Sequence, residues 1–288
     1  PLLLLCAVFF SACAPAPAQT PISPTTPIPA TPSPAATAVP LLYSAPPLAQ
    51  GCELPGSLRD FTVPTHQAAV GELKVRVYFP PCYDAAKSGY PLLVLLHGQT
   101  YTQTQWERLG AARAADELIL SGQAKPFLIL MPYEQHQYRK PNDAAFDLAI
   151  IKDLLPWAEE SLGACASRAC RAVGGISRGA SWAVRLGLLY WDEFGALGAH
   201  SLPTFDNDVK NLPKWIDSIP RAYLPRVWLD TGTADNDKRY AAQFEQALTS
   251  AGVPHVFHLW EGRHNEEYWG AHIQEYIIWY AAGWQELP

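Results

Sequence analysis

From residue 71 onward, the chain alternates between short apolar runs and longer stretches that are apolar on one side only. Residues 71–80 alternate apolar and polar side chains, which predicts a half-buried strand that ends at Pro80-Pro81. Residues 90–96 and 126–132 are continuous apolar runs, as expected of central strands covered on both faces. Four further predicted strands follow at residues 171–176, 195–199, 226–230 and 256–260.

Longer stretches with helical patterning separate these strands. They predict helices at about residues 105–121, 145–162, 180–191, 238–251 and 267–284. Strands that alternate with helices predict an α/β fold with a largely parallel sheet and helices on both faces. Residues 204–224 predict a short packed amphipathic helix or, alternatively, a small lid in which Trp215 lines a ligand site.

The first 50 residues do not have the pattern of a folded element. Residues 2–10 are an apolar run too short to span a bilayer and typical of a secretory signal. The stretch that ends at Cys13 resembles a bacterial lipobox, with Phe10 where Leu is usual, and cleavage near Ala14 or Ala18 is the alternative. Because the chain starts at Pro1 without Met or a basic region, we expect residues to be missing before it.

Composition divides the chain into three parts. Segment 1–13 is the signal and lipobox, residues 14–50 are a spacer rich in Pro, Thr and Ala, and residues 51–288 are one catalytic domain. We therefore expect a protein of the cell envelope or the extracellular space, held at a membrane by a lipid on Cys13. The net charge of −6 and the lack of a basic stripe argue against nucleic-acid partners.

Four cysteines fall within the predicted domain. An even number in an exported domain predicts two disulfides, for which the sequence allows three pairings. Pairing of nearest neighbours gives Cys52–Cys82 and Cys165–Cys170. No cysteine has a partner at the spacing of a zinc site, so we expect no metal.

Gly175, Ser177 and Gly179 form a Gly-x-Ser-x-Gly pattern between a predicted strand and a predicted helix. This is the pattern of a nucleophile elbow, in which a strained serine is presented at the end of a strand. A Cβ at either glycine would collide with the neighbouring strand or helix. Ser177 is therefore the candidate nucleophile.

A serine nucleophile needs a base and an acid, which follow such an elbow in the order acid, then histidine. His264 lies in the loop after the last predicted strand and is the candidate base. Asp235 follows the preceding strand and is the candidate acid, with Asp237 as the alternative, although Asp237 could instead cap a helix. The other histidines after the serine occupy strands, a helix or the stretch next to the elbow helix: His200, His255, His258 and His272.

The expected oxyanion donors are two backbone amides. One is the N–H of Arg178, directly after the nucleophile, and the other is the N–H of Gln99, in the turn after the strand at residues 92–96. We expect His97 to be structural or to shape the pocket. All these positions follow predicted strands, so they should meet at one edge of the sheet.

The chain resembles an esterase family of α/β-hydrolases that includes esterase D, enterochelin esterases, feruloyl esterases and the antigen 85 mycolyltransferases. The resemblance extends from about Lys74 onward. Ala180 stands where the family often has Gly, Arg178 where it commonly has Met or Gln, and Asn265 where it usually has Asp. We expect the Arg178 side chain to make the edge of the pocket more polar. Four segments carry the resemblance: residues 90–98 with Trp106 downstream, residues 171–179, residues 230–235 and residues 262–269.

The resemblance implies an α/β-hydrolase fold and a serine esterase. It would hydrolyse carboxylic esters, of small molecules or linked to polysaccharide, through an acyl-enzyme without a cofactor. Trp106 and Trp269 are candidates for shaping the pocket, with plain packing as the alternative. Two other functions stay open: an acyltransferase of the mycolyltransferase type, and a non-catalytic surface-binding module on a hydrolase scaffold.

Overall fold

The computed structural model describes residues 45–284. The predicted signal segment, Cys13 and the spacer up to residue 44 lie outside the described residues, and residues 45–50 have neither helix nor strand. Among residues 45–284, no helix has both the length and the apolar character needed to cross a membrane.

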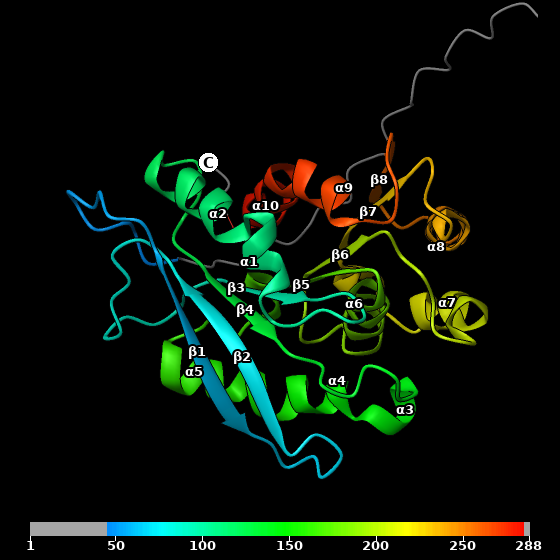
Figure 1. Cartoon of the computed structure of the whole chain (residues 1–288), viewed down its shortest axis with the longest axis horizontal. Coiled ribbons are helices and arrows are strands. Elements are labelled where there is room, and N and C mark those ends of the chain that lie inside the picture. Colours follow the sequence, from blue (N-terminus) through cyan, green and yellow to red (C-terminus); the bar gives the residue numbers. More distant parts are fainter. Residues whose placement is uncertain (1–44, 285–288) are drawn as a thin grey trace, which may run out of the picture. The chain divides into compact units, whose positions relative to one another are not determined.

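An eight-stranded sheet forms the centre of this domain, in the order β1-β2-β4-β3-β5-β6-β7-β8 (Figure 1). β2 runs antiparallel to both of its neighbours, and all pairings from β4 to β8 are parallel. The strands are β1 (Ser57–Pro64), β2 (Glu72–Phe79), β3 (Leu92–Leu96), β4 (Leu128–Pro132), β5 (Arg171–Ile176), β6 (Ala196–His200), β7 (Arg226–Gly232) and β8 (His255–Trp260).

Helices cover both faces of the sheet, which confirms the predicted class. The apolar side chains of α1, α2, α9 and α10 pack on one face, and those of α4 to α8 pack on the other. The helices are α1 (Gln105–Leu109), α2 (Ala111–Leu120), α3 (Pro141–Ala144), α4 (Phe146–Ala149), α5 (Leu155–Leu162), α6 (Arg178–Leu189), α7 (Asp208–Asp217), α8 (Lys238–Ser250), α9 (Glu266–Ala271) and α10 (Ile273–Ala282), with a π-helical turn at Ile150–Leu154 and short 3₁₀ turns at Arg168–Cys170 and Arg221–Tyr223.

Three predicted helices are interrupted. Gly110 adopts a left-handed conformation (φ 99°) and separates α1 from α2, and His272 separates α9 from α10. The helix predicted at residues 145–162 is α4, the π-helical turn and α5 in succession. β1 was not predicted, because five of its eight residues are polar or proline and it pairs only at the edge of the sheet.

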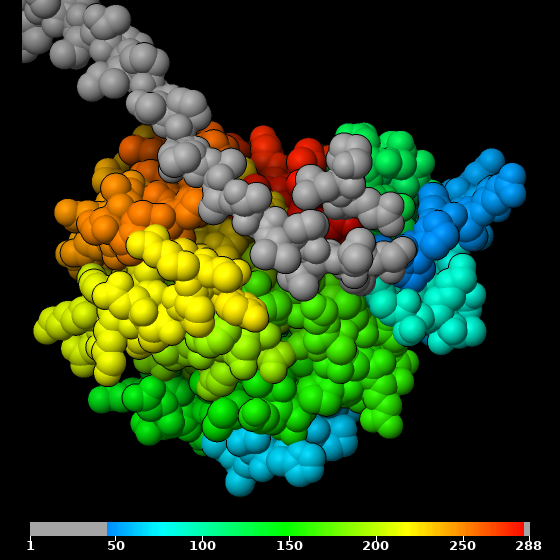
Figure 2. Space-filling model, turned by 180° about the vertical axis from the view of Figure 1, so that it is seen from behind, coloured from blue at the N-terminus to red at the C-terminus, as the bar shows by residue number. Residues whose placement is uncertain are grey.

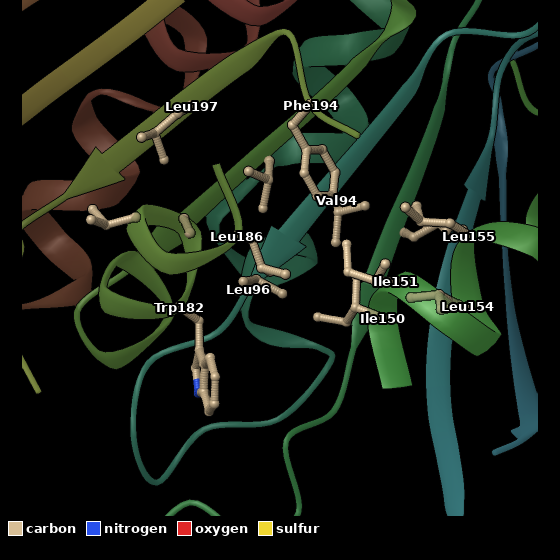
Figure 3. Close-up of a cluster of buried hydrophobic side chains, with 14 of the residues drawn as sticks. Val94, Leu96, Ile150, Ile151, Leu154, Leu155, Trp182, Leu186, Phe194 and Leu197 are labelled. Atoms are coloured by element: carbon tan, nitrogen blue, oxygen red, sulfur yellow. The ribbon is translucent and has the colours of Figure 1, made fainter. Parts of the chain in front are cut away.

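Apolar side chains between the sheet and α4 to α8 form the larger part of the core. Figure 3 shows Val94 and Leu96 of β3 facing Ile150 and Ile151 of the π-helical turn. Burial of each large aliphatic side chain stabilises the fold by about 1.5–3 kcal/mol. The central sheet therefore provides a rigid base for the loops at its edge.

Both predicted disulfides are present. Cys52 pairs with Cys82, with 6.0 Å between Cα atoms, and Cys165 pairs with Cys170 at 6.2 Å. The first joins the segment before β1 to the segment after β2, drawn blue and cyan side by side in Figure 2. The second closes the loop directly before β5, the strand that leads to Ser177.

The stretch at residues 204–224 contains a packed helix. Leu212 and Ile216 of α7 are buried in the core, and α7 packs against α8. Trp215 lies beside the Arg185 guanidinium, at 5.8 Å. The structure therefore confirms the prediction of a packed helix at residues 204–224 and not that of a lid.

Candidate active site

Ser177 stands between β5 and α6 in a conformation that few non-glycine residues adopt. Its φ is 55° and its ψ is −124°. A Cβ at Gly175 would overlap the backbone of Gly179, and one at Gly179 would overlap the backbone of Leu96. The strand, the serine and the helix can approach this closely only with glycine at both positions, as the sequence predicted.

Ser177, His264 and Asp235 form one chain of hydrogen bonds. His264 Nε2 lies 2.8 Å from Ser177 Oγ, and His264 Nδ1 lies 2.8 Å from Asp235 Oδ2. Because a carboxylate only accepts, Nδ1–H donates to Asp235 and Nε2 is left to accept from the serine hydroxyl. The Asp235 side chain is fully buried and that of His264 is 27% exposed, so the histidine remains open to a ligand.

Asp235 is held as a carboxylate. Burial raises the pKa of Asp235, but hydrogen bonds from His264, from the Asp237 amide and from Ser201 outweigh it and hold the pKa below its ordinary value of 3.8. The Asp237 amide donates to Asp235 Oδ1 at 2.8 Å. The structure thus brings Asp235 to the histidine, and Asp237 supports it through its main chain.

Among the described histidines, only His264 bonds to the Ser177 side chain, at 2.8 Å. The main-chain carbonyl of His200 accepts from the Ser177 amide at 2.9 Å. His255 Nδ1 bonds the Val253 carbonyl at 2.8 Å. His258 and His272 stack on the Trp260 ring, with centroid separations of 4.3 and 3.9 Å. His200 lies in the buried cluster described below.

The two expected oxyanion amides lie beside the serine. A Cβ on Gly98, the residue before Gln99, would be 3.5 Å from Ser177 Cβ, and Arg178 follows the serine directly. Within residues 45–284, neither the Gln99 nor the Arg178 amide donates to an acceptor, so both are available to an oxyanion. The next amide along, that of Thr100, donates to the Gln137 side chain and anchors the turn.

The sequence left two roles open for Trp106, Trp269 and His97, namely shaping the pocket or structural packing, and the structure buries all three. Trp106 is fully buried and donates from Nε1 to the Leu96 carbonyl at 3.0 Å, so it packs under the site rather than lining it. Trp269 is 2% exposed, meets the His264 ring edge-on at 5.2 Å and donates to Ser201 Oγ at 2.9 Å. His97 is buried and bonded to the main chain.

Ser201 is a neighbour of Asp235 that was not predicted from the sequence. It follows β6 with a φ of 51° and is fully buried. Its hydroxyl accepts from Trp269, and its hydrogen bond to Asp235 helps to keep that carboxyl ionised. Its position directly after a strand was the available signal.

A second histidine–aspartate pair, His200 and Asp230, is fully buried at the same end of the sheet. Asp230 Oδ1 accepts from His200 Nδ1 at 2.6 Å and from Trp228 Nε1 at 2.9 Å. Asp230 Oδ2 accepts from the hydroxyls of Tyr268 and Tyr276, at 2.9 and 2.8 Å. The four donors satisfy the carboxylate completely, which is the condition for keeping a charge in the core.

His200 completes this cluster through its second nitrogen, which lies 3.0 Å from the Tyr280 hydroxyl. Burial, followed by the charge of Asp230, raises the pKa of Tyr280, so its hydroxyl stays protonated. A Cβ at Gly174 or Gly198, paired residues of β5 and β6, would overlap that hydroxyl. We call His200, Asp230, Tyr268, Tyr276 and Tyr280 the buried cluster.

The Arg178 side chain does not form a free polar edge, contrary to the sequence-based expectation. Its guanidinium makes a two-pronged ion pair with the buried carboxylate of Glu134 and is only 11% exposed. Arg178, which replaces the Met or Gln common in the family, is therefore neutralised by Glu134 inside the protein.

One group of acidic and imidazole side chains within residues 45–284 has ligand atoms within 4.8 Å of one another: Asp235, Asp237 and His264. Both nitrogens of His264 are already hydrogen-bonded, to Asp235 and to Ser177, so a cation held by His264 would have to displace one of these bonds. The arrangement fits an imidazole that moves protons between a carboxylate and a hydroxyl. Beside it is a cavity of about 440 Å³, lined by Ala234, Asn236, Arg263, His264 and Asn265.

Comparison with known proteins finds relatives that are described as esterases. The family described as "Putative esterase" matches residues 67–280. An endo-1,4-beta-xylanase/feruloyl esterase of Xylanibacter ruminicola is 28% identical over 204 residues, which is 64% of this chain and 27% of that protein. An esterase of Mycobacterium tuberculosis is 24% identical over 241 residues, covering 66% of this chain and 52% of that one.

Solved structures share the fold. A ferulic acid esterase superposes with a TM-score of 0.69 and 21% identity, covering 80% of this chain and all of that one. This confirms the α/β-hydrolase architecture. The chain spans about a quarter to a half of the length of the two curated relatives.

Proposed function

The chain belongs to this esterase family, and on that premise we propose that it is a serine esterase that hydrolyses carboxylic esters through an acyl-enzyme on Ser177. The observation that carries the proposal is the hydrogen-bonded chain from Ser177 through His264 to Asp235, with the serine held in a strained turn. Strain of this kind persists at a surface only where the surrounding structure fixes it, and it is concentrated at functional sites.

In the first step, Ser177 Oγ attacks the ester carbonyl while His264 Nε2 takes its proton. Asp235 holds the imidazole in the required tautomer and stabilises the imidazolium that forms. The Gln99 and Arg178 amides bind the oxyanion of the tetrahedral intermediate. Each donor lowers the activation free energy by roughly 3–4 kcal/mol. His264 then gives its proton to the departing alkoxide, which leaves an acyl-serine.

In the second step, water attacks the acyl-serine. His264 takes a proton from that water, the same two amides hold the second oxyanion, and the proton returns to Ser177 as the acid departs. The 27% exposure of His264 gives the water a route to Nε2.

The cavity beside His264 bears on the substrate. Because His264 protonates the leaving alkoxide, the alcohol part of the ester should occupy the space on its side. That cavity is lined by Asn236, Arg263 and Asn265, which can hydrogen-bond to hydroxyl groups. We therefore propose esters of hydroxyl-rich alcohols, as small molecules or linked to polysaccharide. The feruloyl esterase named among the relatives supports this class.

Replacement of Ser177 by Ala tests the mechanism. Hydrolysis of p-nitrophenyl acetate and methyl ferulate should fall by at least about 10⁴-fold, and a fluorophosphonate probe should label the original chain but not the variant. Circular dichroism should show the same fold for both. Unchanged hydrolysis by a folded Ser177→Ala variant would rule the mechanism out.

We also propose that the protein is exported and anchored through Cys13. The two disulfides support export, because such bonds persist in oxidising compartments. Metabolic labelling with a radioactive fatty acid should mark the full-length precursor and not its Cys13→Ser variant. Equal labelling of the two would contradict the anchor.

A further inference from the structure

The Arg178 guanidinium ties the start of α6 to the loop after β4. Nε donates to Glu134 Oε2 at 2.8 Å and Nη2 donates to Oε1 at 2.6 Å. The side chains are 11% and 4% exposed, so water competes little for this pair. Nη2 also donates to the Arg139 carbonyl at 3.1 Å. A two-pronged pair of this kind fixes orientation as well as distance.

Glu134 continues the connection through its main chain. Its amide donates to His97 Nε2 at 2.9 Å, so the proton of the neutral ring must be on Nδ1. Nδ1–H then donates to the Gly98 carbonyl at 2.8 Å. Burial lowers the pKa of His97 to about 4, which keeps the ring neutral and able to accept from Glu134.

The Gly98 carbonyl shares a peptide plane with the Gln99 amide. In a trans peptide the C=O and the N–H point in opposite directions, so a bond that fixes one fixes the other. His97 therefore helps to set the direction of the Gln99 N–H, together with the Tyr101 amide, which donates to the same carbonyl at 3.2 Å. The same series of contacts begins at Arg178, whose own N–H is the other proposed oxyanion donor.

We propose that Arg178, Glu134 and His97 form a relay that holds the two oxyanion donors in register with each other. Arg178 and Glu134 act as positioning residues, and the inference rests on the proposed acyl-enzyme mechanism. The donors come from separate segments, after β3 and after β5, and must converge on one oxygen. Displacement of a donor by a fraction of an ångström weakens oxyanion binding, so a rigid link between the two segments raises kcat.

The same helix contains a matched control pair. Arg185, about two turns after Arg178, makes a two-pronged ion pair with Asp208 at 2.7 and 2.8 Å. The side chains of Arg185 and Asp208 are 12% and 6% exposed. The guanidinium groups of Arg178 and Arg185 both lie over the Phe205 ring. This pair connects α6 to α7 and has no contact with the Gly98–Gln99 turn. Loss of either pair should cost similar stability, but only the first is linked to the oxyanion donors.

The test compares Arg178→Met, Glu134→Gln and their double variant with Arg185→Met, with p-nitrophenyl acetate as substrate. Arg178→Met and Glu134→Gln should each lower kcat about 10- to 100-fold, with KM within about threefold. The double variant should be no slower than the slower single variant, because both changes break one relay. Arg185→Met should change kcat less than about threefold at a similar melting temperature.

An aryl trifluoromethyl ketone adds an independent readout, since its adduct with Ser177 places an oxyanion between the two amides. Its affinity should fall in parallel with kcat in the relay variants only. If Arg178→Met does not fold, Arg178→Lys, which keeps the charge and loses the two-pronged geometry, decides by the same comparison.

Equal losses of kcat in Arg178→Met and Arg185→Met, with wild-type Ser177 still labelled by a fluorophosphonate, overturn the relay alone. A wild-type chain that neither hydrolyses esters nor is labelled at Ser177 overturns the proposed function and the relay with it.

Discussion

Two histidine–aspartate pairs lie at the same end of the sheet, and they differ in what surrounds them. His264 and Asp235 lie in loops after β8 and β7, 2.8 Å apart, and the histidine is partly exposed. His200 is the last residue of β6 and pairs with Asp230 in β7; their side chains are 2.6 Å apart and both are fully buried. The residue types and the separations are nearly the same, so the chemistry must depend on the remaining contacts.

The second nitrogen of each histidine shows the difference. His264 Nε2 reaches a serine hydroxyl at the surface, whereas His200 Nε2 reaches a tyrosine hydroxyl between two strands. A proton accepted by His264 can pass to a leaving group. A proton on His200 has no such acceptor, because its neighbours are other buried groups. The outer pair is suited to catalysis and the inner pair to stability.

Asp235→Asn should separate the two roles most strongly. We expect kcat/KM for p-nitrophenyl acetate to fall by about 10⁴-fold, because an amide cannot stabilise the imidazolium and favours the wrong tautomer. The urea unfolding midpoint should fall less than that of Asp230→Asn. A loss of activity below tenfold would show that Asp235 is not the catalytic acid.

Asp230→Asn should give the opposite result. The amide nitrogen would face donors that now bond to a carboxylate, so we expect a loss of about 3–5 kcal/mol in the free energy of unfolding. The fraction that remains folded should retain kcat/KM within about tenfold. An unchanged urea midpoint would contradict the structural role of the buried cluster.

His97 tests what a carboxylate partner contributes, because it is buried with only main-chain partners. Burial lowers its pKa from 6.5 to about 4, so between these pH values the unfolded chain binds the extra proton. Stability should therefore fall as the pH drops through this window, by about 3 kcal/mol in total from this residue. Urea unfolding at pH 7 and pH 4.5 should show a smaller pH-dependent loss in His97→Gln than in the wild type. Equal losses would remove His97 as the cause.

Tyr280→Phe should have the smallest effect. It removes one hydroxyl and leaves His200 Nε2 without its partner, which should lower the free energy of unfolding by about 1–2 kcal/mol. Tyr138→Phe is the matched control, since Tyr138 is 82% exposed and should change nothing measurable. A loss no larger than that of the control would show that the contact contributes little.

The outer pair could be predicted from the sequence, and the inner pair could not. His264 and Asp235 stand in loops directly after predicted strands, and the topology of a parallel sheet brings such loops together. Asp230 belongs to the same stretch, but it falls within the predicted strand at residues 226–230, and no role was predicted for it. Its partners include tyrosines of α9 and α10, and no local pattern reveals that these side chains cross into the sheet.

The same distinction applies to the fold. Apolar periodicity predicted the seven strands from β2 to β8, because their burial is repeated along the chain. The breaks at Gly110 and His272 depend on how the flanking helices pack, and helical periodicity continues across them. The role of the Arg178 side chain was also hidden, since Glu134 is 44 residues away in sequence.

Gly174 and Gly198, which have no side chains, leave a gap between β5 and β6, and the order in which the chain is synthesised determines when this gap is filled. The Tyr280 side chain of α10 fills this gap from the face of the sheet opposite to α6. Ser177, Asp235 and His264 all precede α10 in the chain. During synthesis the three proposed catalytic residues therefore emerge before the side chain that fills the gap between β5 and β6. Until α10 docks, two adjacent strands at the base of the elbow remain unsupported, so a nascent chain should acquire its activity only as that helix arrives.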